Sequence, residues 1–265
     1  MSRLDQELVS RGLARSRTHA AKLIAAGRIS LDGLTVSRAA KQVGEDQRLA
    51  VQESTDEEYV SRAGHKLAGA LDVFSDIEVA GRRCLDAGAS TGGFTEVLLR
   101  RGAAAVLAVD VGHGQLVETI RNDPRVVVHE GMNVRHLTPA MVGGDVDLVV
   151  ADLSFISLRL VVGALAAVTR PTGDLVLMVK PQFEVGRDNL GRTGVVGSAE
   201  LRRSAVTGVV RSAAEAGLRL AGLARSPLPG QDGNVEFFLR LEAAGSADYP
   251  QSETDAARLA DIDYS

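Results

Sequence analysis

Short apolar runs alternate with helical patterns along most of the chain. The runs cover residues 83–87, 106–110, 126–129, 146–152, 175–180 and 235–241. Short, continuously apolar strands that are separated by helices predict an α/β fold with a doubly wound, mostly parallel sheet. Ligands of such sheets bind beyond the carboxyl ends of the strands. The polar residues that follow these runs are therefore the candidates for chemistry.

The N-terminal segment follows a different pattern. A first helical pattern ends at Gly12, and a second one extends from the N-cap Ser16 to Gly27. Two strand-like runs then flank the dipeptide Asp32-Gly33, which predicts a β-hairpin. We predict a separate small α+β module over residues 1–56.

Charge and hydropathy set the remaining boundaries. An acidic cluster leads into a linker that we place at residues 57–62, and a helix is expected from Ser61. The α/β domain is then expected over residues 63–243. Residues 244–265 combine low hydrophobicity with a strong negative charge, so we expect a disordered acidic tail.

Composition narrows the class of protein. The chain has 265 residues, of which 45% are hydrophobic, as is usual for a globular protein. Its one cysteine, Cys84, excludes an internal disulfide and suits a reducing compartment. No signal peptide is visible, and the longest apolar runs, such as residues 160–168, are too short to span a bilayer. We expect a cytoplasmic protein and, by default, a monomer.

The distribution of charge matters more than its total. The net charge of the whole chain is −4, but residues 1–48 hold nine Lys/Arg against five Asp/Glu. A basic module on an acidic body indicates that the module meets phosphate groups. A merely solvated basic face is the alternative.

The basic module resembles the S4 RNA-binding domain. The residues that carry the resemblance are Arg3-Leu4-Asp5, Arg11-Gly12, Ser16-Arg17, Ala20 and Gly27-Arg28-Ile29. The resemblance implies docking on structured RNA. The candidate RNA-binding residues are Arg3, Arg11, Arg15, Arg17, Lys22 and Arg28 in the module, with Arg62 and His65 after the linker.

A glycine-rich turn follows the first strand of the α/β domain. It reads Asp86-Ala87-Gly88-Ala89-Ser90-Thr91-Gly92-Gly93-Phe94. Its glycines allow a sharp turn and a close approach to a ligand. The spacing of the glycines differs from the G-x-G-x-x-G fingerprint of dinucleotide-binding proteins, and the turn lacks the lysine of a P-loop. Simple turn chemistry is the other interpretation.

This turn resembles motif I of the FtsJ type of class I methyltransferases, which implies a seven-stranded Rossmann-like domain and S-adenosylmethionine as cofactor. Asp110, which ends the second strand, would then bind the ribose hydroxyls, although a helix cap is also open. Met132 and Asn133 would flank the adenine. The segment Asp152-Leu153-Ser154-Phe155 would complete the cofactor site, with Phe155 either covering the cofactor or packing in the core.

Four polar residues stand at informative positions. They are Lys66, Asp152, Lys180 and Glu236. In chain order they resemble the Lys-Asp-Lys-Glu tetrad of 2′-O-methyltransferases. A ribose hydroxyl must lose its proton close to the moment of attack, and a lysine can take it. We expect Lys180 to be the base or proton relay, Asp152 to orient it, and Glu236 to hold Lys66 or the hydroxyl.

Taken from residue 2 to residue 241, the chain resembles the TlyA family, whose members are often called haemolysins. The resemblance implies 2′-O-methylation of cytidine in ribosomal RNA of the small subunit, the large subunit or both. The Gly-rich segment 186–197 is a candidate lid, and Phe183 is a candidate for stacking on a flipped base or for packing. The histidines His113, His129 and His136 lack metal-ligand spacing, so we expect no metal.

Three other functions remain open at this point. The chain could be an S4 protein whose second domain binds cofactor without catalysis, a cytolysin, or a methyltransferase of small molecules. The complete tetrad argues against the first of these, the absence of a long apolar segment against the second, and the basic module against the third.

Overall fold

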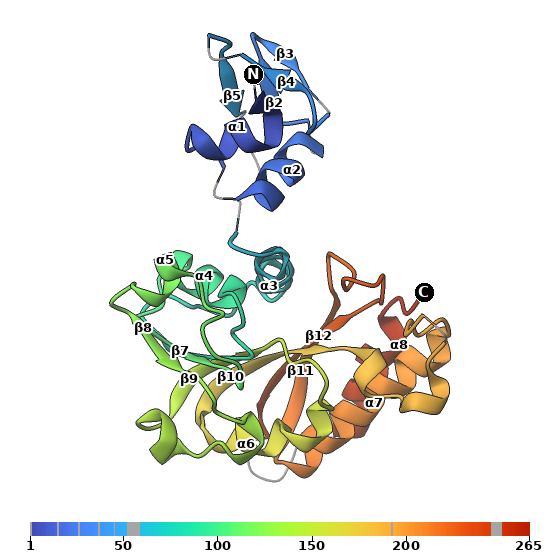
Figure 1. Cartoon of the computed structure of the whole chain (residues 1–265). Helices are drawn as coiled ribbons and strands as arrows, with labels where there is room; N and C mark the ends of the chain where they lie inside the picture. The colour runs from blue at the N-terminus through green and yellow to red at the C-terminus, as the bar shows by residue number, and fades with distance from the viewer. Residues whose placement is uncertain are drawn as a thin grey trace. The chain divides into compact units, whose positions relative to one another are not determined.

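The computed structural model describes residues 2–14, 16–25, 27–36, 38–44, 46–51, 59–191, 193–244 and 251–265. The chain forms two compact units, Met1–Glu58 and Tyr59–Ser265 (Figure 1). Each unit has its own hydrophobic core.

The first unit is a small α+β module. Its helices are α1 (Leu4–Ser10) and α2 (Arg17–Ala25), and its strands are β1 (Ser2–Arg3), β2 (Ile29–Leu31), β3 (Leu34–Thr35), β4 (Gln42–Val43) and β5 (Leu49–Val51). Strand β1 pairs with β4, and the second sheet has the order β3-β2-β5. The predicted N-cap is present, because Ser16 Oγ accepts a hydrogen bond of 3.1 Å from His19 N. The predicted hairpin is also present: Asp32 and Gly33 both have positive φ, as its tight turn requires.

The second unit is a seven-stranded sheet with the order β11-β12-β10-β9-β6-β7-β8. Its strands are β6 (Arg83–Ala87), β7 (Ala105–Val109), β8 (Val126–His129), β9 (Val146–Ala151), β10 (Thr169–Val179), β11 (Leu218–Arg225) and β12 (Phe237–Ala243). Five neighbouring strands are parallel, and β12 is antiparallel to both β10 and β11. The predicted Rossmann-like, mostly parallel sheet is therefore confirmed. The edge strand β11 was not predicted, since it mixes apolar with polar positions and carries an irregularity at Gly222.

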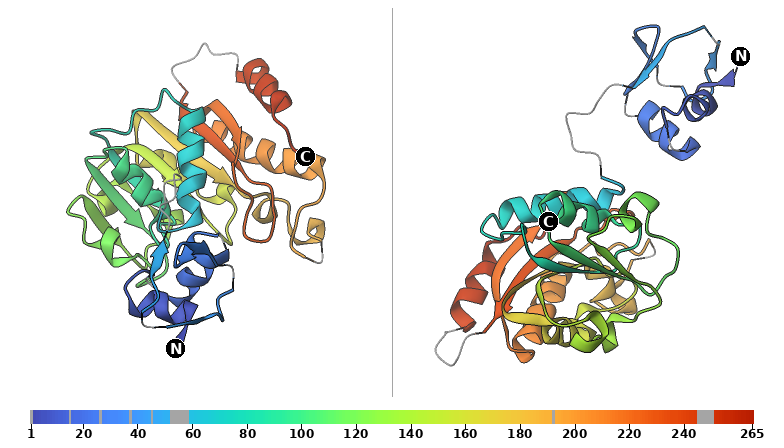
Figure 2. Two further views of the ribbon diagram at one scale, coloured as in Figure 1. Left: turned by 90° about the horizontal axis from the view of Figure 1, so that it is seen from above. Right: turned by 90° about the vertical axis from the view of Figure 1, so that its left-hand side faces the viewer.

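Helices cover both faces of this sheet (Figure 2). The α-helices are α3 (Arg62–Val73), α4 (Gly93–Arg100), α5 (Glu118–Arg121), α6 (Val162–Ala167), α7 (Ala199–Glu215) and α8 (Gln251–Asp261). Short 3-10 turns are η1 (Val134–His136), η2 (Pro139–Val142), η3 (Leu158–Leu160), η4 (Pro181–Phe183) and η5 (Arg187–Asn189). Successive strand residues point to opposite faces, so Val176 packs with α3 and α4 while Leu177 packs with α6 and α7.

The C-terminal segment corrects one prediction. The expected disorder of the tail is wrong for residues 251–265, where helix α8 leads to a buried Tyr264. The Tyr264 ring lies 5.2 Å from that of Phe237, and Arg202 Nη1 donates a hydrogen bond of 2.7 Å to the Tyr264 carbonyl. Leu259 and Tyr264 belong to the hydrophobic core of the second unit. The average composition of the segment gave no sign of this, because many charged residues surround these two in the sequence.

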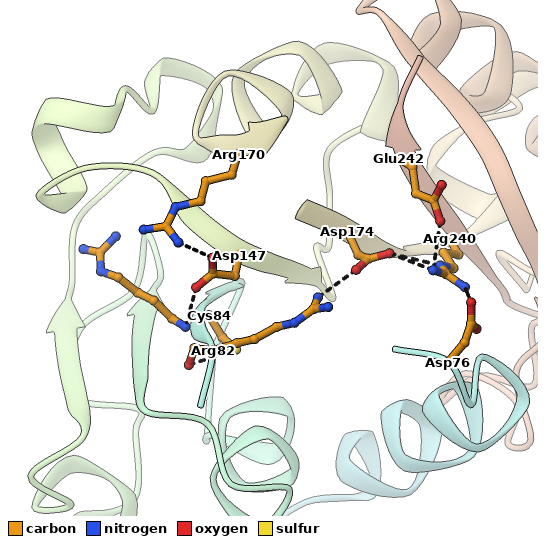
Figure 3. A network of polar contacts seen from close by, with 9 residues as sticks. Asp76, Arg82, Cys84, Asp147, Arg170, Asp174, Arg240 and Glu242 are labelled. Atoms are coloured by element: carbon orange, nitrogen blue, oxygen red, sulfur yellow. Dashed lines mark hydrogen bonds and ion pairs between the residues drawn. The ribbon is translucent and has the colours of Figure 1, made fainter. Parts of the chain in front are cut away.

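A network of charged side chains occupies the amino-terminal edge of the sheet (Figure 3). The buried Asp174 accepts hydrogen bonds from Arg82 at 2.7 Å and Arg240 at 3.1 Å. Arg240 also forms ion pairs with Asp76, beyond α3, and with Glu242 of its own strand. The network ties β10, β12 and α3 together at the edge opposite to the carboxyl ends of the parallel strands, where the candidate site lies.

Candidate active site

The candidate residues gather where strands end. Asp110 and Asp152 each stand one residue beyond a parallel strand, β7 and β9, and Lys180 stands one residue beyond β10. Glu236 directly precedes the antiparallel strand β12, in which Phe237 pairs with Val179. The antiparallel register therefore places Glu236 beside Lys180 at the same edge of the sheet.

The glycine-rich turn lies at the carboxyl end of β6. Gly88 has φ +86°, and a Cβ there would come within 2.7 Å of the Asp152 carbonyl oxygen. Gly92 has φ +99° and begins α4 as its N-cap residue. Only glycine adopts a positive φ and fits where there is no room for a Cβ without strain. These glycines therefore allow the tight packing of the turn as well as the close approach of a ligand.

Two predicted members of the cofactor set are buried beneath this turn. Asp86 is fully buried in β6, and Phe94 is 2% exposed and packs on Phe238. The prediction that Phe94 contacts the cofactor does not fit this position, because the strand–turn–helix geometry directs its ring into the core. The Asp86 carboxylate accepts a hydrogen bond of 2.6 Å from Thr95 Oγ1, while its Oδ1 has no partner. Burial raises the pKa of Asp86 to about 7.

Asp110 organises the side of the site next to β7. Its Oδ2 accepts a hydrogen bond of 2.8 Å from Ser90 N, and its Oδ1 accepts one of 2.7 Å from Gly112 N. Both oxygens keep a further lone pair, and the side chain is only half-buried. Met132 N donates to the Asp110 carbonyl at 3.0 Å, so Met132 lies next to it, and Asn133 uses its side chain to cap η1. Asp110 is thus a turn-capping residue that can still accept a ligand hydroxyl.

The four tetrad residues form two ion pairs. Lys66 Nζ lies 2.6 Å from Glu236 Oε2, and both side chains are buried. Lys180 Nζ lies 2.6 Å from Asp152 Oδ1 and donates a hydrogen bond of 2.9 Å to Ser154 Oγ. Lys180 Nζ is thus held between a carboxylate and a hydroxyl from the segment that follows β9. One buried and one half-buried lysine–carboxylate pair beside a glycine-rich turn are an arrangement that is typical of functional sites.

Two phenylalanine rings stand beside the second pair. Phe155 is 91% exposed and has φ +64°, and its ring lies 5.4 Å from that of Phe183. Lys180 Nζ lies 6.0 Å from the centre of the Phe183 ring. Core packing is therefore excluded for Phe155, and the exposed Phe155 and half-buried Phe183 form an aromatic surface next to the catalytic candidates.

Several of the candidate RNA-binding arginines already form hydrogen bonds within the first unit. Arg3 and Arg17 both donate hydrogen bonds to the Asp5 carboxylate. These bonds, that of Arg3 first and that of Arg17 second, lower the pKa of Asp5 to about 2. Arg11 hydrogen-bonds Glu7 and the carbonyls of Gly44 and Gln47, which is a structural role. Arg15 lies outside the described residues, as does the side chain of Lys22, and Arg28 is half-buried.

Past the linker, Arg62 is exposed at the start of α3, whereas His65 packs edge-on against Tyr59 at 5.0 Å. Tyr59 is a residue that the sequence did not single out. The Arg100 guanidinium lies 4.6 Å above its ring, and the next residue, Val60, donates a backbone hydrogen bond of 2.6 Å to Glu96. The start of α3 is thereby attached to α4, the helix that follows the glycine-rich turn.

The set of side chains fits S-adenosylmethionine. Three carboxylates, those of Asp86, Asp110 and Asp152, surround the turn, and two of them hold a buried oxygen without a hydrogen-bond partner. The carboxylates of Asp110 and Asp152, which are only half-buried, suit a ligand with hydroxyl groups and a positively charged sulfonium and ammonium rather than phosphates. Among the described residues, no group of three His, Cys, Asp or Glu side chains is arranged to hold a metal ion. No helix in that part of the chain is long and apolar enough to cross a membrane.

Comparisons with known proteins agree with this geometry. The FtsJ-like methyltransferase family matches residues 59–243, and the S4 domain matches residues 2–49. A Mycobacterium tuberculosis protein named 16S/23S rRNA (cytidine-2′-O)-methyltransferase TlyA is 57% identical over 240 residues, which cover 91% of this chain and 89% of the relative. Hemolysin A of Brachyspira hyodysenteriae is 35% identical and covers 89% of this chain and 98% of its own length. A solved structure from Streptococcus thermophilus, described as a hemolysin, has a TM-score of 0.74 at 35% identity and covers 98% of this chain and 94% of its own.

Proposed function

Because the chain belongs to the TlyA family of FtsJ-like methyltransferases, we propose that it transfers the methyl group of S-adenosylmethionine to a cytidine 2′-hydroxyl in ribosomal RNA. The observation that carries this proposal is the pair of lysine–carboxylate contacts, Lys66–Glu236 and Lys180–Asp152, at the edge of the sheet that holds the glycine-rich turn. A ribosomal substrate would place the enzyme in the cytoplasm.

The cofactor would be held by residues that follow four parallel strands, β6, β7, β8 and β9. The turn 88–92 would receive its methionine part, and Asp110 its ribose hydroxyls. Met132 and Asn133 would flank the adenine, and the backbone of 152–155 would close the site. When bound there, S-adenosylmethionine supplies an electrophilic methyl group on a sulfonium.

Lys180 would handle the proton of the substrate. Its Nζ would take up the proton of the 2′-hydroxyl, as base or proton relay, so that the hydroxyl oxygen could accept the methyl group that the cofactor would supply. Asp152 and Ser154 hold Nζ in place, at 2.6 Å and 2.9 Å. Glu236 lies next to Lys180 across the β10–β12 pair, and it holds Lys66 in a buried ion pair. This pair would orient the incoming hydroxyl.

Recognition of RNA would be divided between two surfaces. The S4 unit would bind phosphates through exposed arginines such as Arg3 and Arg17, and Arg62 would add a contact near the site. The Phe155–Phe183 pair would stack on the base of the target nucleotide once it leaves its helix. Base stacking would thus hold the ribose close to Lys180.

The direct test is transfer of tritiated methyl to purified 30S and 50S subunits. The wild-type protein should label a ribose of at least one subunit, and Lys180→Met should abolish the label. The matched control is Arg211→Met, which removes an exposed cation from α7. Cofactor affinity, measured by calorimetry, should be similar in all three proteins. Label at the wild-type rate in Lys180→Met would remove Lys180 from the mechanism.

The names of relatives raise a second candidate, lysis of membranes. It is tested by dye release from liposomes that carry anionic lipid, with nucleic-acid-free protein. We expect no release. Release that survives Lys180→Met would establish an activity separate from methyl transfer.

A further inference from the structure

A buried carboxylate lies between the two segments that bear the catalytic candidates. Glu184 stands four residues after Lys180, and only 2% of its side chain is exposed. It belongs neither to the tetrad nor to the expected cofactor set. A carboxylate is withdrawn from water at a cost, so its partners indicate what it does.

Among the described residues, the hydrogen bonds that the Glu184 carboxylate accepts all come from the segment that follows Phe155. Its Oε2 accepts hydrogen bonds from Ser157 Oγ at 2.5 Å and from Arg159 Nε at 3.2 Å, and its Oε1 accepts one from Leu158 N at 2.7 Å. Arg159 Nη2 also donates to the Glu184 carbonyl at 2.9 Å. Glu184 therefore joins the segment after β9 to the segment after β10.

These two segments carry the groups that must be held in register. The first contains Asp152, Ser154 and Phe155, and the second contains Lys180 and Phe183. They touch in three further places: the Lys180–Asp152 ion pair, the Lys180–Ser154 hydrogen bond and the Phe155–Phe183 ring contact. Glu184 is the fourth connection and the one most deeply buried.

The backbone at Phe155 needs such support. Its φ of +64° is unfavourable for a residue with a Cβ, and its ring is 91% exposed, so packing does not hold it. A small cavity also borders Glu184, and Arg159, Asn189, Ser204 and Gly208 are among the residues that line it. Packing around this segment is thus incomplete at Phe155 and at the cavity, and hydrogen bonds help to maintain its shape.

We propose that Glu184 is a positioning residue: it fixes the segment Phe155–Arg159 against the turn Pro181–Phe183, and so holds the Phe155–Phe183 surface and the Ser154–Lys180 contact ready for the nucleotide. The consequence for catalysis rests on the proposed function. The consequence for the shape of the loop does not. Glu184 acts through its neighbours and does not touch the reacting atoms.

The test compares Glu184→Gln with a matched buried carboxylate at the opposite edge of the sheet. Glutamine preserves the size of the side chain but offers one acceptor oxygen for three donors. The control is Asp174→Asn, whose carboxylate is bound by Arg82 and Arg240 in the network of Figure 3. Ser157→Ala removes one of the three bonds and should have a smaller effect.

In Glu184→Gln, the kcat for methyl transfer to the subunits should fall roughly tenfold to hundredfold, since small misplacements of reacting groups have effects of this size. Cofactor affinity should fall much less than kcat, because Glu184 bonds residues 157–159 and neither the turn 88–92 nor Asp110, which would hold most of the cofactor. Asp174→Asn should lose thermal stability while the kcat of the folded fraction is kept. An equal loss of kcat in both variants, or a wild-type kcat in Glu184→Gln, would overturn the proposal.

A second readout is independent of methyl transfer. The chain has six phenylalanines, so fluorophenylalanine labelling gives a simple ¹⁹F spectrum in which Phe155→Leu identifies one signal. Glu184→Gln should shift or broaden the Phe155 signal, and Asp174→Asn should not. If the wild-type protein labels no RNA, the proposed function fails while this spectrum still decides the role of Glu184.

Discussion

Lys66 and Glu236 meet at 2.6 Å although 170 residues separate them in the chain. The contact links α3 to the start of β12, and both side chains are buried. Removing one member of a buried pair leaves the other charge without compensation. We therefore expect Lys66→Met or Glu236→Gln alone to lower the free energy of unfolding by about 3–5 kcal/mol. Urea unfolding measures this loss.

The matched variant for this pair is the double substitution Lys66→Met with Glu236→Leu, which removes both charges. It should recover most of the stability, because no buried charge is left without a partner. It should recover none of the activity, because the charged groups that would orient the hydroxyl are gone. If the double variant is as unstable as the single ones, packing rather than charge explains the loss.

Asp86 gives the fold a defined pH dependence. Its pKa is raised to about 7 by burial, whereas an unfolded chain has an Asp pKa of about 3.9. The folded state therefore binds the proton more tightly. Stability is highest below the unfolded pKa, and it falls as the pH rises from about 4 through about 7, by about 4 kcal/mol at most.

Asp86→Asn removes this titration. In urea unfolding at a series of pH values, the stability of the variant relative to the wild type should rise between about pH 4 and pH 7 and then level off. Thr95 can still bond the amide, so the fold should be kept. A difference that does not depend on pH would show that Asp86 does not change its charge in this range.

Gly93 is held in place by the start of α3. A Cβ at this position would collide with Ser61 Oγ and come within 3.0 Å of Gly64 N, and the second of these groups belongs to the backbone. Gly93→Ala should lower the free energy of unfolding by about 1–3 kcal/mol, since overpacking has this cost. The control is Gly163→Ala in α6, where a Cβ meets nothing within 4 Å. Differential scanning calorimetry should show a lower Tm in the first variant only.

The sequence predicted the parts of the site that depend on strand order. A parallel sheet brings the residues after β7, β9 and β10 to one edge, so Asp110, Asp152 and Lys180 could be placed from the apolar runs alone. Lys66 and Glu236 required the resemblance, because α3 precedes the sheet and β12 runs against its neighbours. Glu184 was missed, because a glutamate in a polar loop gives no sign of burial until the two segments are seen to meet.

Tyr264 marks the other failure of sequence reasoning. Its ring is 8% exposed and packs on Phe237, which neighbours the catalytic candidate Glu236. Tyr264→Ala should lower the free energy of unfolding by about 3 kcal/mol, as expected for loss of a buried aromatic ring. Asp261→Ala, an exposed position of α8, should have little effect. If both variants unfold like the wild type, the C-terminal segment does not contribute to the core.

Phe155 separates recognition from stability. Its ring is 91% exposed, so Phe155→Leu removes almost no buried surface and should leave the Tm unchanged. Stacking of a base on an aromatic ring contributes about 1–3 kcal/mol, and its loss should lower kcat/KM for the ribosomal substrate roughly fivefold to hundredfold. Phe183→Leu should act in the same direction, because its ring lies 5.4 Å from that of Phe155. The control is Leu160→Ala, an exposed apolar residue of η3, which should methylate at the wild-type rate. A normal kcat/KM in both phenylalanine variants would mean that the target base is held by other residues.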